Sequence, residues 1–145
     1  MATRFQVVFD CASPAAQAAF WAEALHYDLQ KPPEGFDSWD EWAGAQGIPE
    51  EQRDNWAAVT DPAGIGPRLY FQKVPEGKIA KNRMHLDLNV GGGPTVPAHE
   101  RKARVLAEVE RLKALGASNG RGAIEQDDEF WVRMNDPEGN EFCVQ

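Results

Sequence analysis

The feature that most constrains the fold of this chain is an internal repeat of an Asp-Pro-x-Gly turn. One copy, Asp61-Pro-Ala-Gly, lies near the middle of the chain, and the other, Asp136-Pro-Glu-Gly, lies near its end. Each copy is flanked by stretches rich in β-branched and aromatic residues, which is the pattern of two strands joined by a tight turn. A repeat at about half the chain length predicts two similar half-modules with a cleft between them.

The elements around the two turns follow the same order. In the first half we expect a strand over residues 5–11, a helix from Ser13 to Leu25, and strands over 27–30, 56–60 and 68–74. In the second half we expect a strand over residues 84–90, a helix over 97–115 that Gly116 ends, and strands over 121–125, 130–135 and 141–144. The predicted fold class is therefore α+β, with one domain over residues 1–145 made of two βαβββ modules. Module 1 covers about residues 1–76 and module 2 about residues 82–145.

Composition narrows the classes of partner. The net charge is −8 and the basic residues are scattered, which disfavours nucleic-acid binding. There is no apolar run of membrane-spanning length and no secretory-signal pattern at the N-terminus. Cys11 and Cys143 are too few for a disulfide scaffold and lie in apolar runs, so we expect buried free thiols and a cytoplasmic location.

A Trp-rich insertion, residues 32–55, interrupts module 1. Ser38 and Glu41 have the spacing of a capping box, which predicts a short helix that carries Trp39 and Trp42 on one face. These two indoles either pin the insertion to the body of the protein or form an aromatic wall over an apolar ligand. A loop of this length inside a compact domain is usually a lid, a binding loop or a flexible segment.

The candidate site combines residues from the opening and closing strands of each half. His85 lies in the opening strand of the second half and Glu141 begins its closing strand, so both could project onto one face. An imidazole and a carboxylate form half of a divalent-metal site, and Glu141 is also the candidate catalytic base. The repeat places Gln6 opposite His85 and Gln72 opposite Glu141, with Tyr70 on the same face as Gln72. The alternative is that His85 is a structural histidine and Glu141 an exposed turn residue.

Further polar and aromatic residues are candidates for holding a ligand. Asp87 follows His85 by two positions, so it shares its face and could orient the imidazole or pair with an arginine. Trp56 and Trp131 lie at the start of corresponding strands in the two halves, where they are expected to pack at the cleft or the sheet edge. The predicted ligand-binding set is Trp39, Trp42, Trp56, Tyr70, Asp87 and Trp131.

Four blocks carry a resemblance to a known family. They are residues 5–15 with 19–25, the turn 61–64 with residues 67–72, residues 82–88 (Asn82-Arg-Met-His-Leu-Asp-Leu), and residues 136–144 (Asp136-Pro-Glu-Gly-Asn-Glu-Phe-Cys-Val). Together they resemble the vicinal oxygen chelate superfamily, in its glyoxalase, bleomycin resistance and dioxygenase branch. The resemblance covers the whole chain apart from the insertion.

The resemblance implies a curved, partly open mixed sheet around a central cleft. It also implies a divalent metal (Zn, Ni, Mn or Fe) held by one residue from the opening and one from the closing strand of each module. Gln6, His85 and Glu141 match such positions, whereas Gln72 stands where the family's enzymes usually carry Glu. Dimers are common in the family, so a homodimer is one expectation.

Two functions remain open at this point. The first is a metal-dependent lyase or dioxygenase that acts on a small molecule in the cleft between the modules. The second is a non-catalytic protein that sequesters an apolar or aromatic small molecule, as antibiotic-resistance proteins of the superfamily do.

Overall fold

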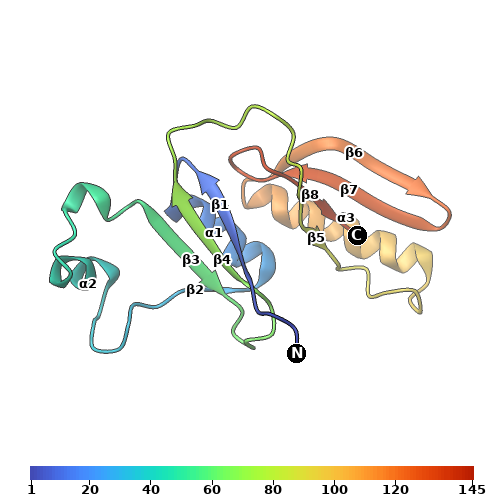
Figure 1. The fold of residues 1–145 in the computed structure, drawn as a ribbon. Helices are drawn as coiled ribbons and strands as arrows, with labels where there is room; N and C mark the ends of the chain where they lie inside the picture. The colour runs from blue at the N-terminus through green and yellow to red at the C-terminus, as the bar shows by residue number, and fades with distance from the viewer. The chain divides into compact units, whose positions relative to one another are not determined.

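The chain folds into two compact α+β units, each built on one four-stranded open sheet (Figure 1). The computed structural model describes residues 1–145. Unit 1 is Met1–Gly77 and unit 2 is Lys78–Gln145. The division falls in the segment that the sequence pattern places between the two modules.

Unit 1 contains a four-stranded sheet, one long helix and the insertion. Its elements are β1 (Gln6–Cys11), α1 (Pro14–Leu25), β2 (Asp28–Leu29), α2 (Trp39–Ala45), the 3-10 turn η1 (Glu50–Gln52), β3 (Trp56–Thr60) and β4 (Arg68–Lys73). The strand order is β1-β4-β3-β2, with β1 parallel to β4 and the other pairs antiparallel.

Unit 2 repeats this arrangement. Its elements are β5 (Asp87–Leu88), α3 (Ala98–Ala114), β6 (Ser118–Gln126), β7 (Glu129–Asn135) and β8 (Glu141–Val144). The order β5-β8-β7-β6, with β5 parallel to β8, matches that of unit 1 element for element. The prediction of two βαβββ modules with open, mixed sheets is therefore confirmed.

The second-module strands differ in length from the pattern-based expectation. The regular ladder of β5 covers only two residues, although Leu86 and Leu88 still accept backbone bonds from Cys143 and Gln145. Strand β6 begins three residues earlier than expected because it pairs with β7 through a bulge between Asn119 and Gly122.

A single helix covers one face of each sheet. In unit 1, α1 packs against β3 and β4, and the ring of Phe9 lies 5.4 Å from Trp21 and 5.3 Å from Phe71. In unit 2, the valines Val105 and Val109 of α3 are buried on the helix face that packs against β7 and β8. The opposite face of each sheet is therefore the one on which polar side chains collect.

The two Asp-Pro turns are built in the same way. Asp61 accepts backbone N–H bonds from Ala63, Ile65 and Gly66 at 2.7–3.0 Å. Asp136, which is 2% exposed, accepts bonds from the backbone of Glu138 and from the backbone and side-chain amides of Asn140, each at 2.9 Å. Each carboxylate satisfies amides of its own loop and so fixes the start of the strand that follows.

The insertion folds as a capped helix tied to the sheet. The Ser38 hydroxyl accepts the Glu41 backbone N–H at 3.0 Å, and the Glu41 carboxylate accepts that of Asp37 at 2.9 Å. The Trp39 indole donates to the Gln30 carbonyl at 2.8 Å, and its ring meets Trp42 edge-on at 5.4 Å. No helix in the chain has the length and apolarity needed to cross a membrane.

Candidate metal-binding site

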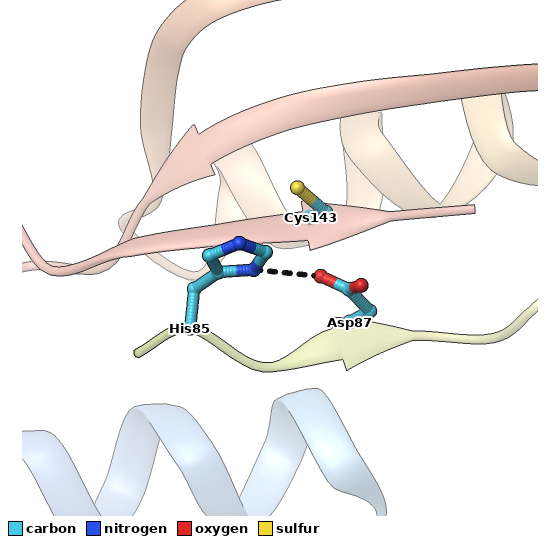
Figure 2. Close-up of side chains that lie close together, drawn as sticks. All are labelled: His85, Asp87 and Cys143. Carbon is cyan, nitrogen blue, oxygen red and sulfur yellow. Dashed lines mark hydrogen bonds and ion pairs between the residues drawn. The ribbon is translucent and has the colours of Figure 1, made fainter. Parts of the chain in front are cut away.

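Three potential ligands of a metal ion meet on the open face of the unit 2 sheet. They are His85, Asp87 and Cys143, and their donor atoms all lie within 4.8 Å of one another (Figure 2). We call them the His85 cluster. Together they offer an imidazole nitrogen, a carboxylate oxygen and a sulfur atom. This set of donor atoms suits Zn²⁺ and related divalent ions.

The alternation of the two strands explains why these side chains meet. Phe142 and Val144 are buried beneath β8, so Cys143 between them points to the opposite face. Leu88 is buried in the same way, which turns Asp87 to the open face. The parallel register then pairs Asp87 directly with Cys143.

Asp87 holds the imidazole ring. Its carboxylate Oδ1 lies 2.8 Å from His85 Nδ1. This is one of the two contacts that the two-residue spacing left open, the other being a pair with an arginine. A carboxylate on one ring nitrogen fixes the orientation of the ring and leaves the other nitrogen free to bind a metal, which is the usual arrangement around histidine ligands.

The thiol of Cys143 is protonated in the neighbourhood of Asp87. Burial raises the pKa of the Cys143 thiol above its ordinary value, and the charge of Asp87 and a hydrogen bond to it raise the pKa further. A cysteine nucleophile needs the opposite shift, since the thiolate is the reactive form. The cluster therefore does not have the character of a nucleophilic site, whereas a metal ion could displace the thiol proton and bind the sulfur.

Glu141 is engaged elsewhere in unit 2. Its carboxylate accepts the Asn82 backbone N–H at 2.9 Å and pairs with Lys78 Nζ at 3.1 Å. These contacts lower the pKa of Glu141 to about 2, first through the Asn82 bond and then through Lys78. A general base works best with a pKa near the operating pH, so this carboxylate is a weak base that ties residues 78–82 to the start of β8.

The two glutamines proposed as ligands lie apart within unit 1. Gln6 pairs in register with Arg68 and accepts a bond from its guanidinium at 2.8 Å. Gln72 pairs with Asp10 and donates to its carboxylate at 2.6 Å. Four register positions therefore separate the two amides along β1 and β4. The residue of β4 that faces Gln6 is Arg68, not Gln72.

The aromatic candidates fall into two groups. Trp56, Tyr70 and Trp131 lie in strands, on the sheet faces opposite the large buried side chains such as Val59, Phe71 and Val132. Trp39 and Trp42 lie in the insertion, where they pack on each other and on the chain after β2. Their contacts match the pinning role that the sequence left open.

The residue that sequence reasoning missed is Cys143. The apolar run around it predicts a buried thiol, yet the structure leaves it half-buried beside His85 and Asp87. The signal was present in the alternation with Phe142 and Val144, which assigns Cys143 to the face opposite the core.

Comparisons with known proteins agree with this fold. The glyoxalase-like domain family matches residues 6–145. No curated protein sequence matches the chain.

Solved structures share the whole fold at low identity. An enzyme of the glyoxalase, bleomycin resistance and dioxygenase family from Burkholderia phytofirmans is 13% identical, with a TM-score of 0.62 over 96% of this chain and 94% of that chain. A variant of a fosfomycin resistance protein from Listeria monocytogenes, in complex with Mn(II) and 1S,2S-dihydroxypropylphosphonic acid, is 10% identical, with a TM-score of 0.59 over 100% of this chain and 90% of that chain. A lactoylglutathione lyase from Agrobacterium tumefaciens is 11% identical, with a TM-score of 0.55 over 99% of this chain and 92% of that chain. The family match over nearly the full length, together with the two βαβββ units, shows that this chain belongs to the glyoxalase-like domain family of the vicinal oxygen chelate superfamily.

Proposed function

We propose that this protein binds a divalent metal ion through the His85 cluster and uses it to hold an oxygen-bearing small molecule on the open face of the unit 2 sheet. The observation that carries the proposal is the convergence of three donor atoms of different chemistry within 4.8 Å. With Asp87 engaged at Nδ1, His85 and Cys143 are the direct protein ligands, and the remaining coordination positions of the ion are open to a small molecule; open positions distinguish catalytic from structural zinc sites.

Each residue has a defined task in this proposal. Asp87 holds the Nδ1 side of His85 so that the other ring nitrogen faces outward as a ligand. Cys143 supplies sulfur after losing its proton. The bound ion would act as a Lewis acid that polarises an oxygen of the small molecule.

Glu141 has a structural task in the proposal. Its bonds to Lys78 and Asn82 hold the segment before β5 against β8, and that segment leads directly into His85. The pairing of β5 with β8 at the cluster has its own backbone bond, from the Cys143 N–H to the Leu86 carbonyl at 2.9 Å, so the cluster does not depend on Glu141. Substitutions can therefore distinguish the His85 cluster from the sequence-based ligand set, which pairs His85 with Glu141.

The proposal is consistent with neighbours that are metal-bound and enzymatic. The fosfomycin resistance protein was solved with Mn(II) and a dihydroxypropylphosphonic acid, and the lyase represents another branch of the superfamily. The sequestration alternative rested on Trp39 and Trp42 as an open aromatic wall. In the structure the two rings pack edge-on against each other, and the Trp39 indole N–H donates to the Gln30 carbonyl. These contacts support an anchoring role instead.

Calorimetric titration with Zn²⁺, Ni²⁺ and Mn²⁺ tests the proposal. Replacing Cys143 with Ser or His85 with Ala should weaken binding by more than about 100-fold, while Asp87→Asn should weaken it by about 10- to 100-fold, as expected for a partner that orients a ligand. Glu141→Gln should change affinity by less than about threefold, because its carboxylate is outside the cluster.

The matched control is His99→Ala, since His99 lies in the first turn of α3 and outside the cluster. If metal binding survives Cys143→Ser but is lost in Glu141→Gln, the ligands are His85 and Glu141, and the proposed cluster is wrong. Absence of stoichiometric binding for all three ions would reject the metal proposal.

A further inference from the structure

The repeat places different chemistry at corresponding positions of the two units. Gln6, Val8 and Tyr70 occupy the register positions in unit 1 that the His85 cluster occupies in unit 2. Arg68 is the first residue of β4, just as Glu141 is the first residue of β8. On this face, unit 1 therefore has no counterpart of the His85 cluster, and its Arg68 guanidinium stands where unit 2 has the Glu141 carboxylate.

The Arg68 side chain is held in one orientation by uncharged groups. Its Nε donates to the Gln30 side-chain oxygen at 2.6 Å, and its Nη1 donates to the Gln6 side-chain oxygen at 2.8 Å. The guanidinium carbon also lies 5.0 Å from the centre of the Tyr70 ring. These bonds leave both hydrogens of Nη2 and one of Nη1 for another acceptor.

The positive charge of Arg68 has no carboxylate partner in unit 1. This is unusual for its surroundings, since unit 1 has twelve acidic and five basic residues. The nearest acidic group in the loop before β4 is Asp61, and three backbone N–H groups already occupy its carboxylate. Hydrogen bonds from these amides lower the pKa of Asp61, which keeps it ionised and bound to its own loop.

A pocket of about 580 Å³ in unit 1 has Arg68 among its lining residues. Its lining also includes Arg4 as a second cation, the acidic Asp61, whose carboxylate is bound by its own loop, and the apolar side chains Phe5, Ile65 and Pro67. Phe5 and Ile65 are 72% and 89% exposed, so they offer apolar surface that no other part of unit 1 covers. Two guanidiniums beside uncovered apolar side chains suit a ligand with an anionic head and an apolar body.

We propose that this pocket of unit 1 is a binding site for a small organic oxyanion, a carboxylate or phosphate ester, with Arg68 as the group that binds its head. Arginine is the residue suited to this because its planar fork makes two parallel bonds to carboxylate or phosphate oxygens. Gln6 and Gln30 position the fork in advance, which reduces the side-chain entropy lost on binding. Arg4 adds charge, and Phe5 and Ile65 contact the body of the ligand.

The test uses the full-length, EDTA-treated protein, so that its result does not depend on metal binding. Calorimetry at low ionic strength compares phenyl phosphate, benzoate and inorganic phosphate. Phenyl phosphate or benzoate should bind more tightly than inorganic phosphate, because only the aromatic probes reach the apolar side chains. Arg68→Gln should weaken the aromatic probe at least about tenfold, and Arg4→Gln by a smaller factor, since a charge-assisted bidentate pair is about twice as strong as a neutral bond.

Arg121→Gln is the matched control, because it removes the same charge from β6 of unit 2 and should leave binding unchanged. Arg4→Gln changes a residue that precedes β1, so it keeps the test informative if Arg68→Gln alters the fold. Preference for phenyl phosphate or for benzoate identifies which oxyanion the site takes. Failure of both aromatic probes to bind, or equal loss of affinity in Arg68→Gln and Arg121→Gln, would overturn the proposal.

Discussion

The Asp136 turn gives a stability prediction whose size follows from its hydrogen bonds. Asp136→Ala removes the carboxylate that accepts bonds from the backbone of Glu138 and from both amides of Asn140. A hydrogen bond to a charged group contributes about 1.5–3 kcal/mol, and three such bonds set an upper limit of roughly 5–9 kcal/mol. Asn140 remains half-buried, so water replaces part of this loss and we expect a net destabilisation of about 3 kcal/mol.

The assay is thermal and urea unfolding followed by circular dichroism. A loss of this size should lower the melting temperature by roughly 10 °C for a small domain. Asp61→Ala is the matched control from the other copy of the repeat, and it should have a smaller effect because water reaches the Ala63 and Ile65 amides. A loss below about 1 kcal/mol for Asp136→Ala, or an equal loss for Asp61→Ala, would refute the reasoning.

Three further changes test separate parts of the structure. Glu141→Gln should destabilise the protein by about 1 kcal/mol at pH 7, after discounting for solvent screening at a partly exposed site. The pKa of Glu141 in the folded protein, about 2, is below the ordinary 4.5. The loss in the free energy of unfolding should therefore be full above pH 4.5 and vanish as the pH falls toward 2. A loss that stays constant when thermal unfolding is repeated at acid pH would contradict this. Trp39→Phe removes the indole bond to the chain after β2 and should cost about 1 kcal/mol in urea unfolding, with no loss expected if the insertion is not anchored there. Gly66→Ala would place a methyl group 2.0 Å from the Tyr27 hydroxyl, so it should lower the melting temperature. Gly64→Asn is the control, because a side chain at Gly64 meets no atom within 4 Å, and it should lower the melting temperature less.

Much of the fold could be predicted from the sequence because its signals are local. Ser13-Pro14 sets the start of α1. Gly116 ends α3, and its backbone N–H donates to the Lys113 carbonyl. The Asp-Pro turns fix the starts of β4 and β8 through contacts within a few residues. Such signals need no knowledge of the distant chain.

The candidate site was harder because it depends on register. Alternation shows that Arg68 and Gln72 share a face, but it does not show how far along the strand each lies. The loop after Asp61 is two residues longer than the loop after Asp136, and the residue that begins β4, and so corresponds to Glu141, is Arg68, four positions before Gln72. Cys143 was missed for a related reason, since its partner Asp87 lies in a strand 56 residues earlier and only the parallel pairing joins them.

The central claim is that Cys143 becomes a metal ligand, and Co²⁺ spectroscopy tests it most directly. Cobalt bound to a thiolate has a sulfur-to-metal charge-transfer band in the near ultraviolet, which an oxygen or nitrogen ligand does not give. The chain offers a matched pair of cysteines, because Cys11 is buried in unit 1, where its sulfur contacts the Gln72 carbonyl at 3.5 Å. We predict that the band appears in wild type and in Cys11→Ser and disappears in Cys143→Ser. A band that persists in Cys143→Ser, or that never appears in wild type with cobalt bound, would contradict the account.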